Sequence, residues 1–417
     1  MAILAIGGLP TDVPQRPQNT RKASSKLGSA FKRAGRYLKD QASEQNNYSA
    51  LYLSPARPEP QQRITTRSAA GDINLDNHID SQLAQKLTAL NYYSRHNSSI
   101  GTSPPAYIAS SQRSSASAKM SSATGPGIFK DMKRHQYASE NILQSYDVLV
   151  PERGQSSESK QPLWLVYTHG GYFRDPKVDS ISFKPAIEQI ESSHTGQSSL
   201  KSRISGYASL NYRLSPHPGH PQNPDTTPSY ELNKAHWPDQ PLDVQSALHH
   251  LQNHYPESKN YILIGHSVGA TLAFLAALQC AEAGVVAPQA VVGVSGIYDF
   301  VDIHRTNPDY EVLTKNAMDP AQYSETSPAL YSAETYRQKW KADASEQEDE
   351  DRVVVLAHSR DDGLVVWDQL EEMERVFKGQ RGFKSELVEL KGKHNEIWEQ
   401  GAELVRAIQH TLELVSL

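Results

Sequence analysis

The chain has 417 residues, of which 37% are hydrophobic and 21% charged, and its formal net charge is −5 at pH 7. This length suits one large α/β domain with additional segments, whereas the low hydrophobic fraction indicates that part of the chain does not pack into a core. The single cysteine, Cys280, excludes an internal disulfide and any cysteine-based metal cluster, and we expect it to be a small buried side chain.

Charge divides the chain into two parts. Residues 1–130 contain 16 Lys or Arg and 7 Asp or Glu, whereas the rest of the chain contains 26 and 40. The first part is rich in Ser, Gln, Asn and Pro, and it has too few apolar side chains to offset the entropy of ordering it. We therefore predict a disordered basic arm over 1–130, with transient helices at 27–38 and 75–90, and a folded domain over 131–417.

The N-terminus gives little sign of targeting. It lacks a positively charged start and a long apolar run, and no stretch approaches the about 18 apolar residues of a membrane-spanning helix. The basic run also lacks a folded nucleic-acid-binding motif. We expect a cytoplasmic protein that binds neither membranes nor nucleic acids, with a mitochondrial transit peptide over 13–39 as the alternative.

From about residue 131, apolar runs of strand length alternate with helical segments. The predicted strands are 145–150, 162–170, 203–214, 261–265, 290–296, 352–359 and 384–390. The predicted helices are 240–255, 267–284, 365–378 and 395–415. Continuous apolar strands separated by helices indicate a mostly parallel central sheet covered by helices on both faces, with 145–150 as a candidate antiparallel edge strand.

Three irregular segments interrupt this alternation. A Pro-rich loop follows the strand at 203–214, and the weakly periodic segment 298–345 is predicted to be a small cap-like insertion that forms a lid or substrate wall. The acidic run 345–351 is expected to be a solvated loop. His217 and His220 lie among prolines in the Pro-rich loop and do not share a helix face, so we predict no metal site there.

The sharpest motif is the G-x-S-x-G sequence from Gly265 to Gly269, which lies between a predicted buried strand and a predicted buried helix. This context is that of a nucleophile elbow, in which the strand turns abruptly into the helix and presents a serine hydroxyl above the sheet. Gly265 and Gly269 lack the side chains that would collide across such a turn. We therefore predict that Ser267 is the nucleophile of an α/β-hydrolase fold.

A second motif, His169-Gly170-Gly171, directly follows the apolar run "WLVYT" (164–168) of the strand predicted over 162–170. Acyl-transfer enzymes stabilise the oxyanion of the tetrahedral intermediate with backbone N–H groups, which requires close approach of the backbone. We predict that Gly170 and Gly171 supply two of these donors and that the N–H of Val268 supplies a third.

The order of the remaining candidates matches a catalytic triad. In this fold the acid and then the histidine follow the serine along the chain. Asp362 follows the strand at 352–359, with the adjacent Asp361 as the alternative, and His394 lies between the last strand and the closing helix. His410 is a weaker candidate base because it lies within a helical pattern. We expect a serine hydrolase that needs neither metal nor cofactor.

These motifs resemble those of the kynurenine formamidases, also called arylformamidases, and of their fungal members in particular. The similar segments are "RHQYASENILQSYDVLVP" (134–151), "HGGYFRDP" (169–176), "GHSVGATLAF" (265–274), "SGIYDF" (295–300), "HSRDDGLV" (358–365) and "GKHNEIWE" (392–399). The resemblance covers about 131–417, and it departs from the family at Phe173, where the family motif has tryptophan.

The resemblance implies that Ser267, Asp362 and His394 hydrolyse N-formyl-L-kynurenine to L-kynurenine and formate, with Gly170 and Gly171 in the oxyanion hole. The leaving group is then an aryl amine, for which aromatic walls are expected. The candidates for these walls are Tyr172, Phe173 and Tyr298.

Two alternatives to a formamidase stay open at this point. A carboxylesterase with the same HGG motif would share every catalytic residue, and a binding protein on a hydrolase scaffold would share the fold alone. The expected partner is a small-molecule substrate, and the sequence leaves a homodimer open.

Overall fold

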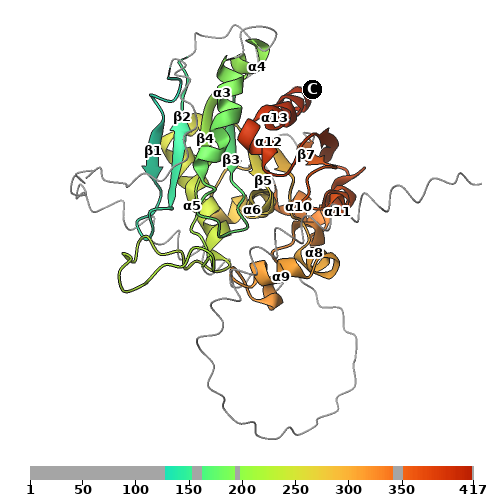
Figure 1. The fold of residues 1–417 in the computed structure, drawn as a ribbon. Coiled ribbons are helices and arrows are strands. Elements are labelled where there is room, and N and C mark those ends of the chain that lie inside the picture. Colours follow the sequence, from blue (N-terminus) through green and yellow to red (C-terminus); the bar gives the residue numbers. More distant parts are fainter. Residues whose placement is uncertain (1–126, 153–161, 193–197, 341–350, 416–417) are drawn as a thin grey trace, which may run out of the picture.

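The computed structural model describes residues 127–152, 162–192, 198–340 and 351–415. The predicted arm, apart from its last four residues, and most of the acidic run lie outside these residues. The described strands form one sheet of eight strands in the order β1-β2-β4-β3-β5-β6-β7-β8 (Figure 1). They are β1 (Lys133–Gln136), β2 (Ser145–Leu149), β3 (Leu163–Thr168), β4 (Ile204–Leu210), β5 (Tyr261–His266), β6 (Ala290–Val294), β7 (Arg352–Ser359) and β8 (Phe383–Leu390).

Helices and short 3₁₀ turns connect the strands. The α-helices are α3 (Lys184–Ser192), α4 (Ser198–Ser202), α5 (Asp239–His254), α6 (Val268–Ala277), α7 (Cys280–Ala283), α8 (Phe300–Thr306), α9 (Asp309–Thr314), α10 (Ala333–Lys339), α11 (Trp367–Phe377), α12 (Glu396–Gln400) and α13 (Ala402–Leu414). The 3₁₀ turns are η2 (Ser180–Phe183), η3 (Pro256–Lys259), η4 (Pro320–Gln322) and η5 (Pro328–Leu330).

The sheet is mostly parallel, as predicted. Strands β4, β3, β5, β6, β7 and β8 pair in parallel, whereas β1 and β2 are antiparallel additions at one edge. The edge strand is therefore β1 rather than the predicted 145–150. Four polar residues make up β1, so it has no apolar pattern, and its pairing depends on its neighbour β2.

Two apolar layers cover the sheet. Successive residues of β3 alternate between them: Trp164 packs into the layer that contains α5, α6 and α11, and Leu165 packs into the layer that contains α3 and α13. Burial on both faces explains why the central strands are continuous apolar runs rather than alternating ones. With the serine elbow after β5, this architecture is the predicted α/β-hydrolase fold.

The predicted closing helix over 395–415 is two helices, α12 and α13, which are separated at Gly401. This residue has φ 77°, and a Cβ atom there would lie 2.6 Å from the carbonyl carbon of Pro185. Glycine is thus required both for the backbone conformation and for close contact with α3. Similarly, the predicted helix over 267–284 consists of α6 and the short α7.

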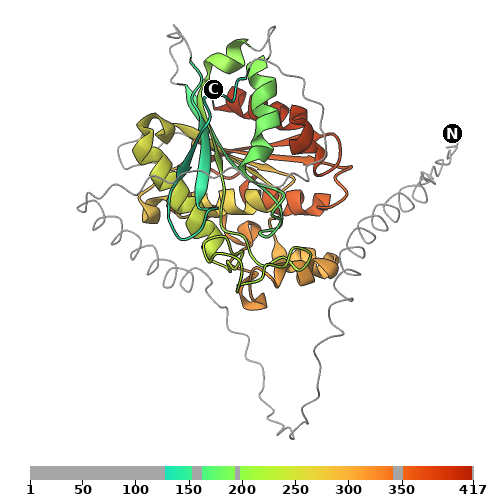
Figure 2. The ribbon, with the colours of Figure 1, turned by 60° about the vertical axis from the view of Figure 1, so that its left-hand side comes forward.

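The described part of segment 298–345 contains α8, α9, η4, η5 and α10. It lies beside the Pro-rich loop that follows β4, beyond the carboxyl ends of the strands (Figure 2). The N–H of Trp237 donates to the carbonyl of Ala317 at 2.7 Å, and the Trp237 indole donates to Glu325 at 2.6 Å. The two irregular segments therefore form a joined layer over one end of the sheet.

Candidate active site

Ser267 lies at the turn between β5 and α6 with φ 56° and ψ −125°, a conformation that is strained for a residue with a side chain. Its N–H donates to the carbonyl of Val294 in β6 at 2.9 Å. A Cβ atom on Gly265 would lie 2.1 Å from the Gly269 carbonyl oxygen, and one on Gly269 would lie 2.2 Å from the Thr168 carbonyl oxygen. The two glycines therefore permit the turn, as the motif predicts.

His394 and Asp362 form a buried pair, with 6% and 3% of their surfaces exposed. His394 Nδ1 lies 3.0 and 2.9 Å from the two carboxylate oxygens, and Asp362 Oδ1 also accepts the N–H groups of Leu364 at 3.0 Å and Val365 at 2.7 Å. Burial alone would raise the pKa of Asp362, but His394 and these hydrogen bonds hold it well below its usual value. The alternative acid, Asp361, is exposed.

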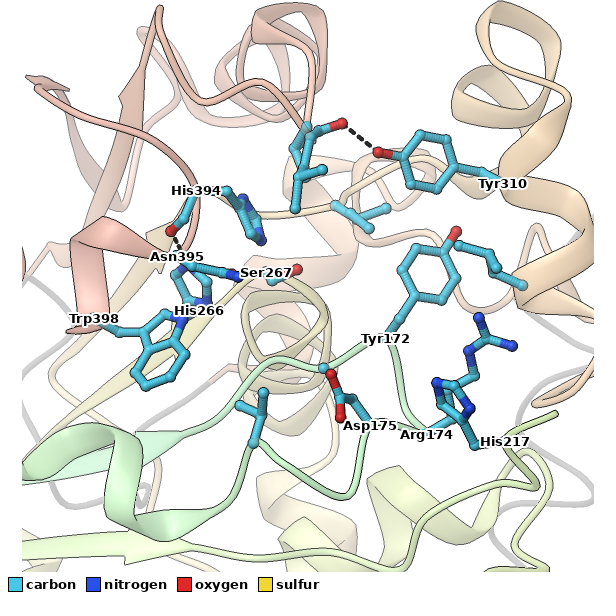
Figure 3. A pocket seen from close by; sticks show the side chains of 16 residues that line it. Tyr172, Arg174, Asp175, His217, His266, Ser267, Tyr310, His394, Asn395 and Trp398 are labelled. Atoms are coloured by element: carbon cyan, nitrogen blue, oxygen red, sulfur yellow. Dashed lines mark hydrogen bonds between the residues drawn. The ribbon is translucent and has the colours of Figure 1, made fainter. Parts of the chain in front are cut away.

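Because Asp362 binds Nδ1, the Nε2 atom of His394 is the nitrogen available to the serine. Ser267 and His394 line the same cavity, and Figure 3 shows the imidazole directed toward the serine. Within the described ranges no hydrogen bond joins the two side chains. Such bonds often form only when substrate binds, through a small side-chain movement. The rival base His410 lies in α13 and does not line the cavity.

The HGG loop holds one peptide group in a fixed orientation. The carbonyl of Gly170 accepts the Tyr212 hydroxyl at 2.8 Å and lies 2.9 Å from His169 Nδ1, while the His169 ring stacks on Tyr212 at 4.3 Å. In a trans peptide the N–H of Gly171 points opposite to this carbonyl. No group in the described ranges accepts that N–H, and Gly171 lines the cavity beside Ser267. The N–H of Val268, at the start of α6, lies next to the serine.

His266 connects the elbow to the loop that carries the catalytic histidine. Its Nε2 atom donates to the carbonyl of His394 at 3.1 Å, and the two rings are 4.6 Å apart. Burial, reinforced by the nearby His394, lowers the pKa of His266 to about 3. His266 is thus a neutral donor that positions the base, a role that its place inside the elbow motif does not reveal.

The cavity encloses about 810 Å³, including its open mouth. Elements from both halves of the sheet and from the cap segment contribute to it (Figure 3). Its lining residues are Gly171, Tyr172, Arg174, Asp175, Val178, His217, His266, Ser267, Ile297, Tyr310, Leu313, Leu364, Val365, His394, Asn395 and Trp398.

The structure supports one of the three predicted aromatic walls and contradicts two. Tyr172 lines the cavity, and its ring stacks on Tyr310 at 5.7 Å. Phe173 is fully buried and packs on Phe300, while Tyr298 is 1% exposed and packs on Phe274 in the core. The prediction that Phe173 and Tyr298 contact the substrate was wrong because both side chains point into the apolar core rather than into the cavity.

Sequence reasoning missed several cavity residues. Arg174 lies within the similar segment 169–176, after the HGG motif, but nothing in its neighbours showed that it is buried at a cavity wall. His217 was considered only as a metal ligand, Tyr310 belongs to a segment without a catalytic motif, and Trp398 lies in the motif around His394, where it was given no role. Only their positions in the folded chain identify these four residues, because the Pro-rich loop, the cap segment and α12 come together at the cavity only after folding.

Other features of the described residues bear on the sequence predictions. Cys280 is buried, which raises the pKa of its thiol to about 12, and its Sγ donates to the carbonyl of Ala276. The described ranges contain no group of three or more His, Cys, Asp or Glu side chains that could hold a metal ion. None of the described helices combines the length and apolar character that crossing a bilayer requires.

Comparison with known proteins points to one family. A kynurenine formamidase-like hydrolase from Fusarium equiseti is 29% identical over 283 residues, which cover 64% of this chain and 89% of that protein. A kynurenine formamidase from Aspergillus versicolor is 29% identical over 265 residues, which cover 58% of this chain and 85% of that protein. The chain has the α/β-hydrolase fold and is similar in sequence to these kynurenine formamidases.

This relationship confirms the resemblance seen in the sequence motifs. No protein-family model matches the chain. Among solved structures, a thermostable esterase from Pseudomonas putida aligns at 15% identity with a TM-score of 0.43, over 68% of this chain and 81% of that one.

Proposed function

We propose that this chain is a serine hydrolase that cleaves the formamide of N-formyl-L-kynurenine to L-kynurenine and formate in tryptophan degradation. The observation that carries the proposal is the cavity in which Ser267, the buried His394–Asp362 pair and the N–H of Gly171 meet. The kynurenine formamidase relatives support the choice of substrate.

Each group has a step in the proposed mechanism. His394 Nε2 takes the proton of the Ser267 hydroxyl as the oxygen attacks the formyl carbon, because a serine hydroxyl is a weak nucleophile at neutral pH. Asp362 holds Nδ1 protonated and stabilises the imidazolium that forms. The carbonyl oxygen becomes an oxyanion and accepts the N–H groups of Gly170, Gly171 and Val268.

Collapse of the tetrahedral intermediate breaks the C–N bond. His394 transfers its proton to the departing aniline nitrogen, so that L-kynurenine leaves and a formyl ester remains on Ser267. A water molecule then loses a proton to His394 and attacks this ester, which releases formate and restores the hydroxyl.

The HGG loop packs closely against the elbow. A Cβ atom on Gly170 would lie only 3.0 Å from the Ser267 Cβ and 3.0 Å from the His266 Nδ1. The protein backbone therefore comes close to the serine on this side.

The test is turnover of N-formyl-L-kynurenine by the purified full chain, followed by the absorbance of kynurenine and by mass spectrometry. We expect kynurenine to form and kcat/KM to exceed that for p-nitrophenyl acetate. Cleavage of the ester without any formamide turnover would instead establish the carboxylesterase alternative. Ser267→Ala should abolish turnover and labelling by a fluorophosphonate probe.

Ser246→Ala serves as the matched control, since this serine lies on α5, bonds the Leu242 carbonyl and does not line the cavity. It should retain both activities. Labelling that persists in Ser267→Ala would contradict the assignment of the nucleophile. An absence of labelling and turnover in the unmodified chain would favour a binding protein on a hydrolase scaffold.

A further inference from the structure

One end of the cavity carries a buried cation. Arg174 is 3% exposed and lines the cavity together with His217, which is 8% exposed, and Figure 3 shows the two side by side, with Tyr172 between them and Ser267. A guanidinium carries five N–H donors in a planar fork, so it can bind a carboxylate ligand in addition to its contacts within the protein. A cation at the wall of a substrate cavity therefore favours ligands that bring negative charge to that wall.

His217 presents a hydrogen-bond donor at the same place. Its Nδ1 accepts the N–H of Gly219 at 3.0 Å, so the proton of the neutral ring is on Nε2. Burial, followed by the charge of Arg174, lowers the pKa of His217 to about 4, which keeps the ring neutral at physiological pH. Nε2 has no hydrogen-bond partner within the described part of the chain, so it remains available to a ligand.

Both residues are fixed relative to the oxyanion loop. The N–H of Arg174 donates to the Gly171 carbonyl at 3.0 Å, and the N–H of Ser215 donates to the Phe173 carbonyl at 2.9 Å. The second bond ties the Pro-rich loop that carries His217 to the HGG segment. The backbone segments that carry the two side chains therefore keep a defined position with respect to the N–H of Gly171.

Asp175 is the acidic residue that lines this cavity. Its carboxylate accepts the N–H of Lys177 at 2.9 Å and so caps its own turn. The cavity thus offers an arginine, a histidine donor and, nearby, one carboxylate. This arrangement matches the two charges of an α-amino acid, whose carboxylate and ammonium groups are bonded to one carbon.

We propose that Arg174, assisted by His217, binds the α-carboxylate of the substrate and makes the enzyme select aryl formamides that carry an α-amino-acid group. This proposal rests on the proposed function and adds the residues that set its specificity. A guanidinium binds a carboxylate through two parallel hydrogen bonds, which a neutral ligand cannot reproduce. The stacked Tyr172 and Tyr310 rings would then flank the aryl group between the two ends of the cavity.

The experiment compares N-formyl-L-kynurenine with 2′-formamidoacetophenone, which has the same aryl ketone and formamide but lacks the amino acid. The quantity measured is the ratio of their kcat/KM values. Arg174→Gln should lower this ratio by about 10- to 100-fold, because it removes charged hydrogen bonds that only the substrate with a carboxylate can form. Arg174→Lys should lower it less, because it retains the charge without the paired geometry.

Arg360→Gln is the control, since Arg360 is exposed, lies over the Trp367 ring and does not line the cavity. It should leave the ratio unchanged. Equal losses on both substrates in Arg174→Gln would show a purely structural role and overturn the proposal. If Arg174→Gln left kcat/KM unchanged for both substrates, the proposal would be overturned as well.

A measurement on the unmodified enzyme covers the case in which Arg174→Gln does not fold. L-Kynurenine should inhibit at least 10-fold more tightly than its decarboxylated analogue kynurenamine, since only the former has the carboxylate. Equal inhibition would refute the carboxylate site. Cleavage of 2′-formamidoacetophenone or esters without turnover of N-formyl-L-kynurenine would instead refute the proposed function, and this proposal with it.

Discussion

Tyr212 supports the oxyanion hole without contacting the substrate, and Tyr212→Phe isolates this contribution. The hydroxyl donates to the Gly170 carbonyl at 2.8 Å and to the His169 carbonyl at 3.1 Å, and the side chain is fully buried. Phenylalanine keeps the ring on which His169 stacks. The substitution therefore removes the hydrogen bonds that orient the Gly170–Gly171 peptide while it leaves the packing in place.

Two effects of different size are expected. The lost buried hydrogen bonds should lower the free energy of unfolding by about 1–3 kcal/mol. Removing an oxyanion donor completely costs about 10²–10³ in kcat. Because the Gly170 carbonyl keeps its contact with His169 Nδ1 at 2.9 Å, the peptide should be loosened rather than lost. We therefore expect kcat to fall by about 10-fold with little change in KM.

The assay measures kcat and KM for N-formyl-L-kynurenine alongside urea unfolding of the same protein. Tyr207→Phe is the matched control: Tyr207 is buried in β4, its hydroxyl bonds Glu191, and it packs on the opposite face of the sheet. It should lower the free energy of unfolding but not kcat. If Tyr212→Phe also lost stability with an unchanged kcat, the link from this hydroxyl to the oxyanion hole would be wrong.

Three further predictions test the site. Asp362→Asn should lower kcat by about 10³–10⁴ because the amide favours the wrong imidazole tautomer. Asp361→Asn, at an exposed position, should keep near-normal kcat. If Asp361→Asn lowered kcat more than Asp362→Asn, Asp361 would be the catalytic acid. Gly269→Ala places a methyl group 2.2 Å from a β3 carbonyl oxygen, so we expect insoluble or inactive protein, and a normal kcat would contradict the elbow geometry. The neutral His266 has a pKa of about 3 when folded and about 6.5 when unfolded, so the unfolded chain binds more protons between these values. The contribution of His266 to the free energy of unfolding is therefore complete above pH 6.5 and is lost as pH falls, by about 2 kcal/mol at pH 5. His266→Gln should flatten the measured decrease of the free energy of unfolding over that pH range.

The features that could be predicted from sequence are those encoded locally. The elbow from Gly265 to Gly269 lies within one strand–turn–helix segment. A Cβ atom on either glycine would lie 2.1 or 2.2 Å from a backbone carbonyl oxygen, and the motif predicts this need for glycine. The central strands were recognisable because both of their faces are buried. The edge strand β1 was missed because its residues are polar and only its partner makes it a strand.

The side-chain directions could not be predicted in the same way. Tyr172 and Phe173 are neighbours with φ 50° and 65°, yet the first faces the cavity and the second faces the core. Backbone conformations of this kind are set by the surrounding fold rather than by residue type. Likewise, Arg174 and His217 are 43 positions apart in the sequence and meet only because the Pro-rich loop folds back on the HGG segment.

The backbone at Ser267 has a consequence for how this chain tolerates change. Its left-handed conformation is unfavourable by about 1–3 kcal/mol for a residue with a Cβ atom, and glycine would relieve most of that penalty. A descendant that no longer needed the hydroxyl would therefore gain folding stability by replacing it. At this position the strained backbone serves catalysis at a cost in folding stability.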